Sequence, residues 1–324
     1  MEYIRNTLDF YVPEPSVISL GKFDGLHLGH KYLIRELEKG KQEGYKSVVF
    51  TFDIPPRSLS ENDCRVLSTN AEKEHIFEEA GMDYVIECPF TDELKQMEPY
   101  AFLKMLTERI RIRKIVAGTD FRFGNNRSGS PADLKMYEKE FGYQAVIVDK
   151  IQYMGEDISS TRIRKLVCEG RMEEANTLLG YPYFLNARVL HGNEIGRKLG
   201  FPTVNLLPPE HKILPPNGVY VSSVTLDGEL YNGVSNIGCK PSIEGTYPVG
   251  VETHIFDFDS QIYDREIKVS FLSYLRPERK FDSLEELRRQ IEADRETARC
   301  YCRGQAKEKE KKMNMLKTGC LQRF

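Results

Sequence analysis

The hydrophobic pattern of this 324-residue chain changes near residue 180, and this change most narrows the folds open to it. Before that point, short apolar runs alternate with helix-like segments, which is the pattern of βαβ units around a parallel sheet. After it, apolar strands follow one another with only turn residues between them. The chain is also longer than one hydrophobic core usually supports. We therefore predict two domains, residues 1–180 and 181–324, that meet near Gly180-Tyr181-Pro182.

The first half carries the signals of a parallel α/β sheet. We expect its strands at residues 17–20, 47–52, 84–87, 114–117 and 145–148. The segment 30–43 places Leu33, Ile34 and Leu37 on one face and ends near Gly44, as an amphipathic helix with a glycine at its C-terminus does.

The second half has the pattern of an antiparallel β domain followed by a helix. We expect its strands at residues 184–190, 218–226, 229–236, 251–256 and 266–272. Asp227-Gly228, between two of these strands, is a two-residue hairpin signal. Ser283 and Glu286 form the capping-box pattern of a helix start. The apolar face of this helix would carry Leu284, Leu287 and Ile291.

Composition and charge argue against several classes of protein. Hydrophobic residues make up 40% of the chain and charged residues 29%, with a formal net charge of −3, so we expect a globular protein that binds no nucleic acid. Acidic residues near the start differ from a secretory signal, and no apolar run reaches membrane-spanning length. The seven cysteines form no Cys-x-x-Cys pair, which fits reduced thiols. We expect a cytoplasmic protein without a membrane partner.

The segment GKFDGLHLGH, residues 21–30, places two histidines where a strand turns into a helix. A helix N-terminus attracts phosphate, because its backbone N–H groups are unpaired and carry partial positive charge. Gly29 would let the backbone approach a phosphate closely, and His27 and His30 could donate hydrogen bonds as charge develops during phosphoryl or nucleotidyl transfer. Taken alone, the pair is equally compatible with ordinary surface or capping histidines.

Two later segments of the first half contain further polar candidates. Asp120, in GTDFRFG at 118–124, would lie just past a strand, where it could bind a nucleotide, hold a basic group or simply form a turn. Ser160 and Thr161, in ISSTRIR at 158–164, would begin a helix and either cap it or hold phosphate. Arg164 follows one turn later and is suited to phosphate.

These three segments resemble, in order, the three signatures of the adenylyltransferase half of the bacterial bifunctional riboflavin kinase/FAD synthetases, within the HxGH nucleotidylyltransferase superfamily. In the second half, GRKLGFPTVNL at 196–206 resembles the GxPTAN signature of riboflavin kinases, with Val204 in place of alanine. GVSNIG at 233–238 and VETHIFDF at 251–258 are also similar to riboflavin kinases. YLRPERKFDSLEELRRQI at 274–291 resembles their flap and closing helix.

The resemblance implies an α/β plus β fold. It predicts an N-terminal Rossmann-like nucleotidylyltransferase domain with a parallel sheet, and a C-terminal antiparallel β-barrel riboflavin kinase domain with a long terminal helix. The implied activity is a transferase that phosphorylates riboflavin to FMN with ATP and then adenylylates FMN to FAD, with release of pyrophosphate. Its partners would be riboflavin, FMN, FAD and ATP, its cofactor Mg²⁺, and its state a monomer or weak homo-oligomer.

Site residues follow from the same resemblance. The catalytic residues would be Glu252, as general base on the ribityl hydroxyl, and His27 and His30. Magnesium would be held by Thr203 and Asn205, which point to one side of a strand-like segment, and flavin would contact Arg276 and Phe281. ATP or phosphate would contact Gly21, Phe23, Asp24, Gly25, Gly29, Asp120, Ser160, Thr161, Arg164, Gly192, Gly196, Lys198, Gly200 and Pro202.

One departure from the family pattern leaves alternatives open. The family usually shows TFEPHP after its second strand, whereas this chain has TFDIPP at residues 51–56 and lacks that histidine. A second hypothesis is therefore a riboflavin kinase with an impaired adenylyltransferase domain. A third is a flavin- or nucleotide-binding regulator without turnover, although binding alone would not need Glu252, Thr203 and Asn205 together.

Overall fold

The computed structural model describes residues 1–53, 65–191, 196, 200–239 and 249–317, and the chain divides into two compact units. The first unit comprises Met1–Arg164, Leu178–Gly180 and His211–Ile213. The second comprises Lys165–Thr177, Tyr181–Glu210 and Leu214–Phe324. The chain passes between the two units more than once. That residue 180 separates two activities therefore stays a prediction.

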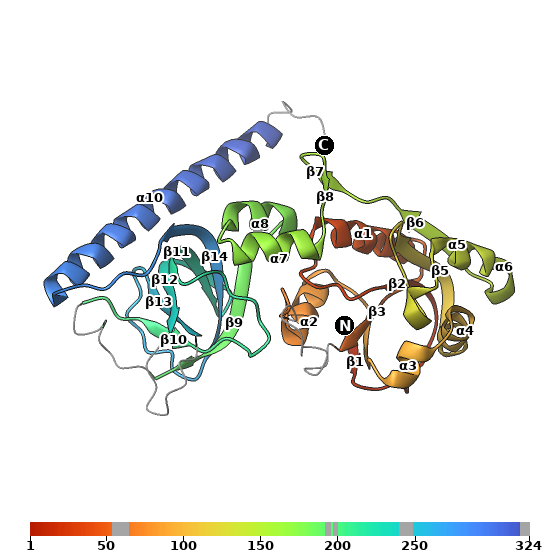
Figure 1. Ribbon diagram of the computed structural model, residues 1–324. Helices are drawn as coiled ribbons and strands as arrows, with labels where there is room; N and C mark the ends of the chain where they lie inside the picture. Colours follow the sequence, from red (N-terminus) through yellow and green to blue (C-terminus); the bar gives the residue numbers. More distant parts are fainter. Residues whose placement is uncertain (54–64, 192–195, 197–199, 240–248, 318–324) are drawn as a thin grey trace. The chain divides into compact units, whose positions relative to one another are not determined.

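The first unit is built on a six-stranded parallel sheet in the order β1-β4-β3-β2-β5-β6 (Figure 1). Its strands are β1 (Glu2–Arg5), β2 (Val12–Leu20), β3 (Lys46–Asp53), β4 (Tyr84–Pro89), β5 (Ile110–Gly118) and β6 (Gln144–Val148). The predicted parallel α/β fold is thus confirmed. The strand β1 was not predicted, because it is a four-residue edge strand without a fully buried side chain.

Helices cover both faces of this sheet, and β2 shows why. Val17 packs in one core cluster with Ile34 and Leu37, whereas Ile18 packs in another with Phe102. The helices of the first unit are α1 (Leu28–Gln42), α2 (Asn70–Glu79), α3 (Asp92–Gln96), α4 (Pro99–Arg109), α5 (Pro131–Met136) and α6 (Glu138–Phe141). Helix α7 (Ser160–Cys168) begins in the first unit and ends in the second, and most of α8 (Met172–Leu179) belongs to the second. A 3₁₀ turn, η2 (Asn125–Arg127), and a small hairpin of β7 (Gln152–Tyr153) and β8 (Glu156–Asp157) complete the first unit.

The strand order reverses beside β2. The chain runs from β2 outward through β3 to β4, and then returns to the other side of β2 with β5 and β6. The loops that follow β2 and β5 therefore leave the same carboxyl edge of the sheet at its switch point. Ligands of open α/β sheets bind in the crevice at such a point.

The second unit contains a closed antiparallel barrel in the order β10-β13-β12-β11-β14-β9 (Figure 1). Its strands are β9 (Tyr183–Leu190), β10 (Val204–Leu206), β11 (Gly218–Leu226), β12 (Glu229–Cys239), β13 (Val249–Ile255) and β14 (Glu266–Arg276). The predicted hairpin is confirmed, because Leu226 pairs with Glu229 across Asp227 and Gly228, which both have positive φ. This is the backbone that a two-residue hairpin turn requires.

The barrel interior combines apolar residues with a satisfied polar cluster. Along β13, Val251 and Thr253 are fully buried while Glu252 and His254 between them are only partly covered. The buried hydroxyl of Ser235 lies 2.8 Å from the hydroxyl of Ser222 and 2.8 Å from that of Thr253. Because each hydroxyl has a partner, the polar interior carries no unpaired donor there.

The terminal helix α10 (Leu284–Lys317) follows the barrel. The hydroxyl of Ser283 accepts a hydrogen bond from the amide of Glu286, as predicted. The other half of the predicted capping box differs, because the Glu286 carboxylate accepts from the amide of Asp282. The predicted apolar face is wrong at its first position, because Leu284 is 66% exposed. The helix packs further along, where Ala298 is buried and Asp294 pairs with a residue of β14. Among the described helices, none combines the length and apolar character needed to cross a membrane.

Candidate active sites

The turn between β2 and α1 is tight and partly strained. His27 is the N-cap of α1, with extended backbone, so the helix begins at Leu28. Phe23, Gly25 and Leu26 all have positive φ. Glycine adopts this conformation freely, whereas the phenylalanine and the leucine each store on the order of 1–3 kcal/mol of strain, which is typical of functional turns.

The two histidines of this turn lie directly against each other. Their rings stack with centroids 3.8 Å apart and planes inclined by 20°. A Cβ atom at Gly29 would lie 3.0 Å from two atoms of the His27 ring. The glycine therefore leaves room for the imidazole, and its predicted contact with phosphate stays a prediction.

Burial keeps both imidazoles neutral at pH 7. It lowers the pKa of His27 to about 4, although the carboxylates of Asp24 and Asp120 oppose this change. Burial and the neighbouring His27 ring hold the pKa of His30 well below its usual range. Within the described part of the chain, neither Nδ1 atom has a hydrogen-bond partner. Each neutral ring can thus offer a ring nitrogen to a ligand at a helix N-terminus.

The carboxylate of Asp24 binds other groups of the first unit through both of its oxygens. One carboxylate oxygen accepts hydrogen bonds from the amides of Leu67 and Ser68, at 2.8 and 3.1 Å. The other accepts from the guanidinium of Arg164 at 2.5 Å. In this geometry Asp24 orients Arg164, and its predicted contact with ATP or phosphate stays a prediction. No local signal in the sequence connects two residues that are 140 positions apart.

Arg164 retains capacity for a ligand. Its Nε is buried and has no hydrogen-bond partner among the described residues. The hydroxyl of Ser160 donates to the carbonyl of Asp24 at 2.8 Å, and the helix cap is instead the hydroxyl of Ser159, which accepts from the Arg162 amide. Thr161 is exposed. Ser160, which was expected to cap α7 or hold phosphate, therefore binds the backbone of the turn that contains His27.

Asp120 follows β5 and lies at the same carboxyl edge of the sheet. Its carboxylate lies 3.3 Å from the ammonium of Lys150, so it holds a basic group, which is one of the roles expected for it. Its charge also acts on His27. Gly21, at the end of β2, lies close to the ring of Phe23: a Cβ atom at this glycine would lie 3.2 Å from the ring.

In the barrel, three polar residues from neighbouring strands share one face. Asn205 of β10 pairs with Glu252 of β13, which in turn pairs with Asn236 of β12. Cross-strand partners point to the same side of a sheet. Asn236 lies in the GVSNIG segment but was not predicted as a site residue, because only the strand register brings it beside Glu252.

His254 positions the segment that precedes β10. Its Nδ1 lies 2.9 Å from the carbonyl oxygen of Pro202, and its ring meets that of Phe201 edge-on. Burial lowers the pKa of His254, so the ring is neutral at pH 7. Alternation along the strand places His254 on the same face as Glu252.

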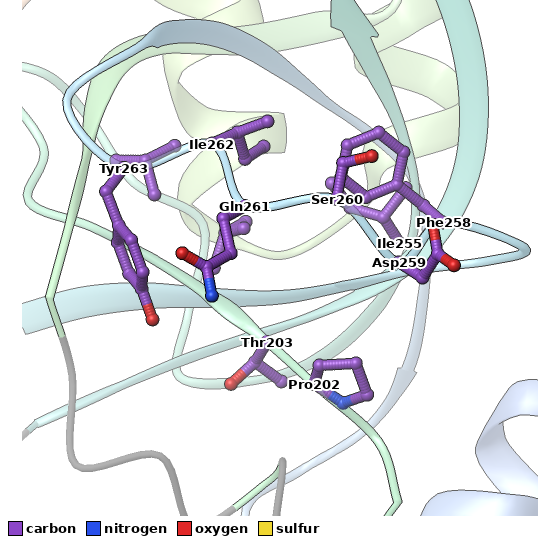
Figure 2. A pocket seen from close by; sticks show the side chains of 11 residues that line it. Pro202, Thr203, Ile255, Phe258, Asp259, Ser260, Gln261, Ile262 and Tyr263 are labelled. Carbon is purple, nitrogen blue, oxygen red and sulfur yellow. The ribbon is translucent and has the colours of Figure 1, made fainter.

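A cavity opens beside Thr203. Apart from Thr203 itself, it is lined by Val189, Pro202, Val204, Ile255, Phe258, Asp259, Ser260, Gln261, Ile262 and Tyr263. Figure 2 shows Pro202 and Thr203 on one side of this space, with Gln261 and Tyr263 on the other. The ring of Tyr263 stacks on His191, with centroids 3.8 Å apart. Apolar walls with a few polar groups are typical of a small-molecule site.

Of the remaining predicted residues of the second unit, some make contacts that the structure describes and others lie outside the described residues. Arg276 donates to the buried carboxylate of Asp294 at 2.9 and 2.6 Å and lies 5.9 Å from the ring centroid of Phe281. Gly196 and Gly200 are described; a Cβ atom at Gly196 would lie 2.4 Å from the carbonyl oxygen of Phe201, and Gly200 has positive φ. Gly192 and Lys198 lie outside the described residues.

Comparison with known proteins covers both halves of the chain. A family model described as FAD synthetase matches residues 10–162, and one described as riboflavin kinase matches residues 179–302. The chain is 33% identical to a bifunctional riboflavin kinase/FMN adenylyltransferase of Listeria monocytogenes over 91% of this chain and 95% of that protein. It is 35% identical to the Haemophilus influenzae protein of the same name, over 88% of this chain and 93% of that one.

A solved structure is similar along nearly the whole chain. The crystal structure of a macrolide-efflux protein from Streptococcus pneumoniae matches with a TM-score of 0.82 and 32% identity. The match covers 92% of this chain and 98% of that one. Together with the two matching domain models and the identity to full-length relatives, this likeness shows that the chain belongs to the bifunctional riboflavin kinase/FMN adenylyltransferase family.

Proposed function

We propose that this chain makes FMN from riboflavin and ATP in its barrel, and FAD from FMN and a second ATP in its α/β unit. The observation that carries the proposal is the register of the barrel, in which Asn205 and Glu252 are direct cross-strand partners. This register brings a metal-type amide oxygen beside a carboxylate that can act as a base, an arrangement that a binding protein would not need. The boundary near residue 180 would then separate the two activities.

In the kinase reaction, Glu252 takes the proton of the terminal ribityl hydroxyl of riboflavin. The hydroxyl oxygen forms a bond to the γ-phosphorus of ATP as the bond to ADP breaks. We assign the nucleotide to the neighbourhood of the small cavity beside Thr203, where apolar side chains and Tyr263 lie next to the proposed metal-binding residues. Arg276 and Phe281 would contact the flavin, with Arg276 already oriented by Asp294.

Magnesium fits this arrangement chemically. The hydroxyl of Thr203 and the amide oxygen of Asn205 are hard oxygen ligands, and Mg²⁺ is usually held by one or two protein groups together with phosphates and waters. When bound, the ion neutralises the charge that develops on the transferred phosphoryl group. His254 contributes by holding the carbonyl of Pro202, next to Thr203.

In the adenylyl transfer, an oxygen of the FMN phosphate attacks the α-phosphorus of ATP, and pyrophosphate leaves. The buried imidazoles of His27 and His30 donate hydrogen bonds to phosphate oxygens as the transition state forms. Their low pKa values support this role, because an uncharged ring at the N-terminus of α1 is ready to donate without first losing a solvation shell. Arg164, oriented by Asp24, supplies a permanent positive charge.

A product assay tests the proposal. Purified protein is incubated with riboflavin, ATP and Mg²⁺, and FMN and FAD are quantified separately. We expect both products, with FMN appearing first. FMN without FAD would instead support the kinase-only hypothesis raised by the TFDIPP segment, whose residues 54–56 lie outside the described part of the chain. Binding of flavin and nucleotide with neither product would support the regulator hypothesis.

A further inference from the structure

A short segment from far along the chain forms part of the first unit. Residues His211–Ile213 belong to this unit, whereas the residues on either side of them belong to the second. Lys212 is buried there, and its ammonium donates to the carboxylate of Glu72 at 2.6 Å and to the carbonyl of Leu67 at 2.7 Å. The mechanism proposed above does not use this lysine.

Backbone hydrogen bonds also join residues 211–213 to Val66. Val66 forms a parallel bridge with Lys212: its amide donates to the carbonyl of His211 at 2.8 Å, and its carbonyl accepts from the amide of Ile213 at 3.0 Å. The side chain of Lys212 then binds the next carbonyl, that of Leu67. Residues 66 and 67 are therefore held by both the backbone and the side chain of this segment.

The held backbone leads directly to the histidine turn. The amide of Leu67, whose carbonyl Lys212 binds, donates to the carboxylate of Asp24, and so does the amide of Ser68. The other oxygen of that carboxylate orients Arg164. A continuous series of contacts thus runs from Lys212 through Leu67 and Asp24 to the guanidinium, and each step involves a buried or partly buried group.

We propose that Lys212 is a positioning residue for adenylyl transfer, which acts by holding the Leu67–Ser68 backbone so that Asp24 presents Arg164 to the nucleotide. The inference rests on the proposed function of the first unit. It makes adenylyl transfer depend on a residue 32 positions beyond the predicted domain boundary at residue 180. Kinase activity uses other residues, so it should not depend on Lys212.

The primary test is Lys212→Met in the full-length protein, assayed for FAD from FMN and for FMN from riboflavin. We expect kcat/KM for FAD formation to fall on the order of 10–100-fold, because small displacements of a positioned group are costly. FMN formation should stay within about twofold of the wild-type rate, given the separate residues it uses. The matched control is Lys114→Met. Lys114 is another lysine of this unit, and it forms an ion pair with Glu43. This control should leave both activities unchanged.

A double-mutant cycle with Arg164→Lys separates positioning from general destabilisation. If Lys212 acts through Asp24 and Arg164, the two substitutions are coupled, and adding Lys212→Met to the Arg164→Lys variant costs less than about twofold further. A lysine that only stabilised the unit would give losses that multiply. Multiplying losses would overturn the proposal.

A second variant covers the case in which Lys212→Met does not fold, because the substitution leaves the carboxylate of Glu72 buried without its cation. The double variant Lys212→Met/Glu72→Gln removes that charge, and the glutamine oxygen can still accept the amide hydrogen bond of Thr69 that caps α2. The Leu67 carbonyl still lacks its donor in this variant. We therefore expect the same loss of FAD formation, and full activity would overturn the proposal.

The wild-type reaction distinguishes failure of the proposed function from failure of the role proposed for Lys212. Absence of FAD from the wild-type reaction would refute the proposed function of the first unit. Wild-type FAD formation that persists undiminished in Lys212→Met, or a variant that loses FMN formation equally, would refute the role of Lys212 alone.

Discussion

His27 and His30 stand at a helix N-terminus, yet burial determines their chemistry at neutral pH. An exposed pair would titrate near pH 6.5, whereas desolvation lowers the pKa of His27 to about 4 and that of His30 well below its usual range. The rings are therefore neutral hydrogen-bonding groups before a nucleotide arrives. The negative charge of a bound triphosphate would raise both pKa values and strengthen the hydrogen bonds that they donate.

Replacing His30 tests this role. We expect His30→Ala to lower FAD formation about 10²–10³-fold, the usual loss when a transition-state hydrogen-bond donor is removed. FMN formation should be spared. His75→Ala is the matched control, because His75 is an exposed histidine of α2 that pairs with Glu79. Equal loss of both products in His30→Ala would show that the histidine supports the whole chain rather than one reaction.

The lowered pKa values also predict a pH dependence of stability. Between about pH 6.5 and pH 4, His27 binds more protons in the unfolded chain than in the folded one. Its stabilising contribution is therefore complete above pH 6.5 and is lost progressively as the pH falls toward 4. Hydrogen exchange of α1, corrected for intrinsic rates, should show weaker protection at pH 5 than at pH 7.

The variant His27→Gln should reduce this pH dependence, because it removes one of the two buried imidazoles. His75→Gln, at an exposed position, should leave it unchanged. Identical pH dependence in wild-type protein and His27→Gln would contradict the assignment of the effect to His27.

At the scale of elements, α1 begins after His27, carries His30 and is held very close to β2. A Cβ atom at Gly40 of α1 would lie 2.4 Å from a methyl group of Val17. This close contact fixes α1 against the strand that leads into the histidine turn. The helix pattern in the sequence predicted α1 within two residues at each end, but it did not reveal this contact.

Gly40→Ala should therefore destabilise the first unit. Overpacking of this kind typically costs about 1–3 kcal/mol. Urea denaturation should show a lower midpoint, and FAD formation should fall more than FMN formation because α1 is displaced. Gly304→Ala is a useful contrast, since a Cβ atom at Gly304 of α10 would meet no atom within 4 Å outside the adjacent backbone of its own helix. That variant should be stabilised by about 0.5–1 kcal/mol, from helix propensity alone.

The predicted strands were largely confirmed, because apolar runs bounded by turn residues are local signals. Elements with little buried surface were missed, among them β1 and the two-residue strands β7 and β8. Leu284 shows the opposite error. Its spacing suits a buried face, but the anchoring ion pair lies ten residues further on, between Arg276 and Asp294.

For the whole molecule, the two proposed reactions should be separable by substitution. Glu252→Gln should lower FMN formation about 10²–10⁴-fold, the usual contribution of a general base. Riboflavin binding should be retained, because the amide has nearly the same shape. When FMN is supplied instead of riboflavin, the variant should form FAD at the wild-type rate. Chromatographic separation of the two products measures both effects.

Glu266→Gln, at an exposed position of β14, serves as the control for this experiment and should not affect either product. Failure of added FMN to restore FAD formation in Glu252→Gln would contradict the independence of the two activities. The same outcome would argue against a separate flavin site in the first unit.

The sequence by itself determined the elements and the order of the motifs, because hydrophobic period, capping pattern and turn residues act over a few neighbouring positions. It placed His27 and His30 at a helix start and Thr203 and Asn205 near one strand. The tertiary structure alone decided which distant groups meet: Asp24 with Arg164, Asn236 with Glu252, and Lys212 with Glu72. It also decided that the imidazoles are neutral. These features depend on strand register and on exclusion of water, which arise only when segments far apart in the chain pack together.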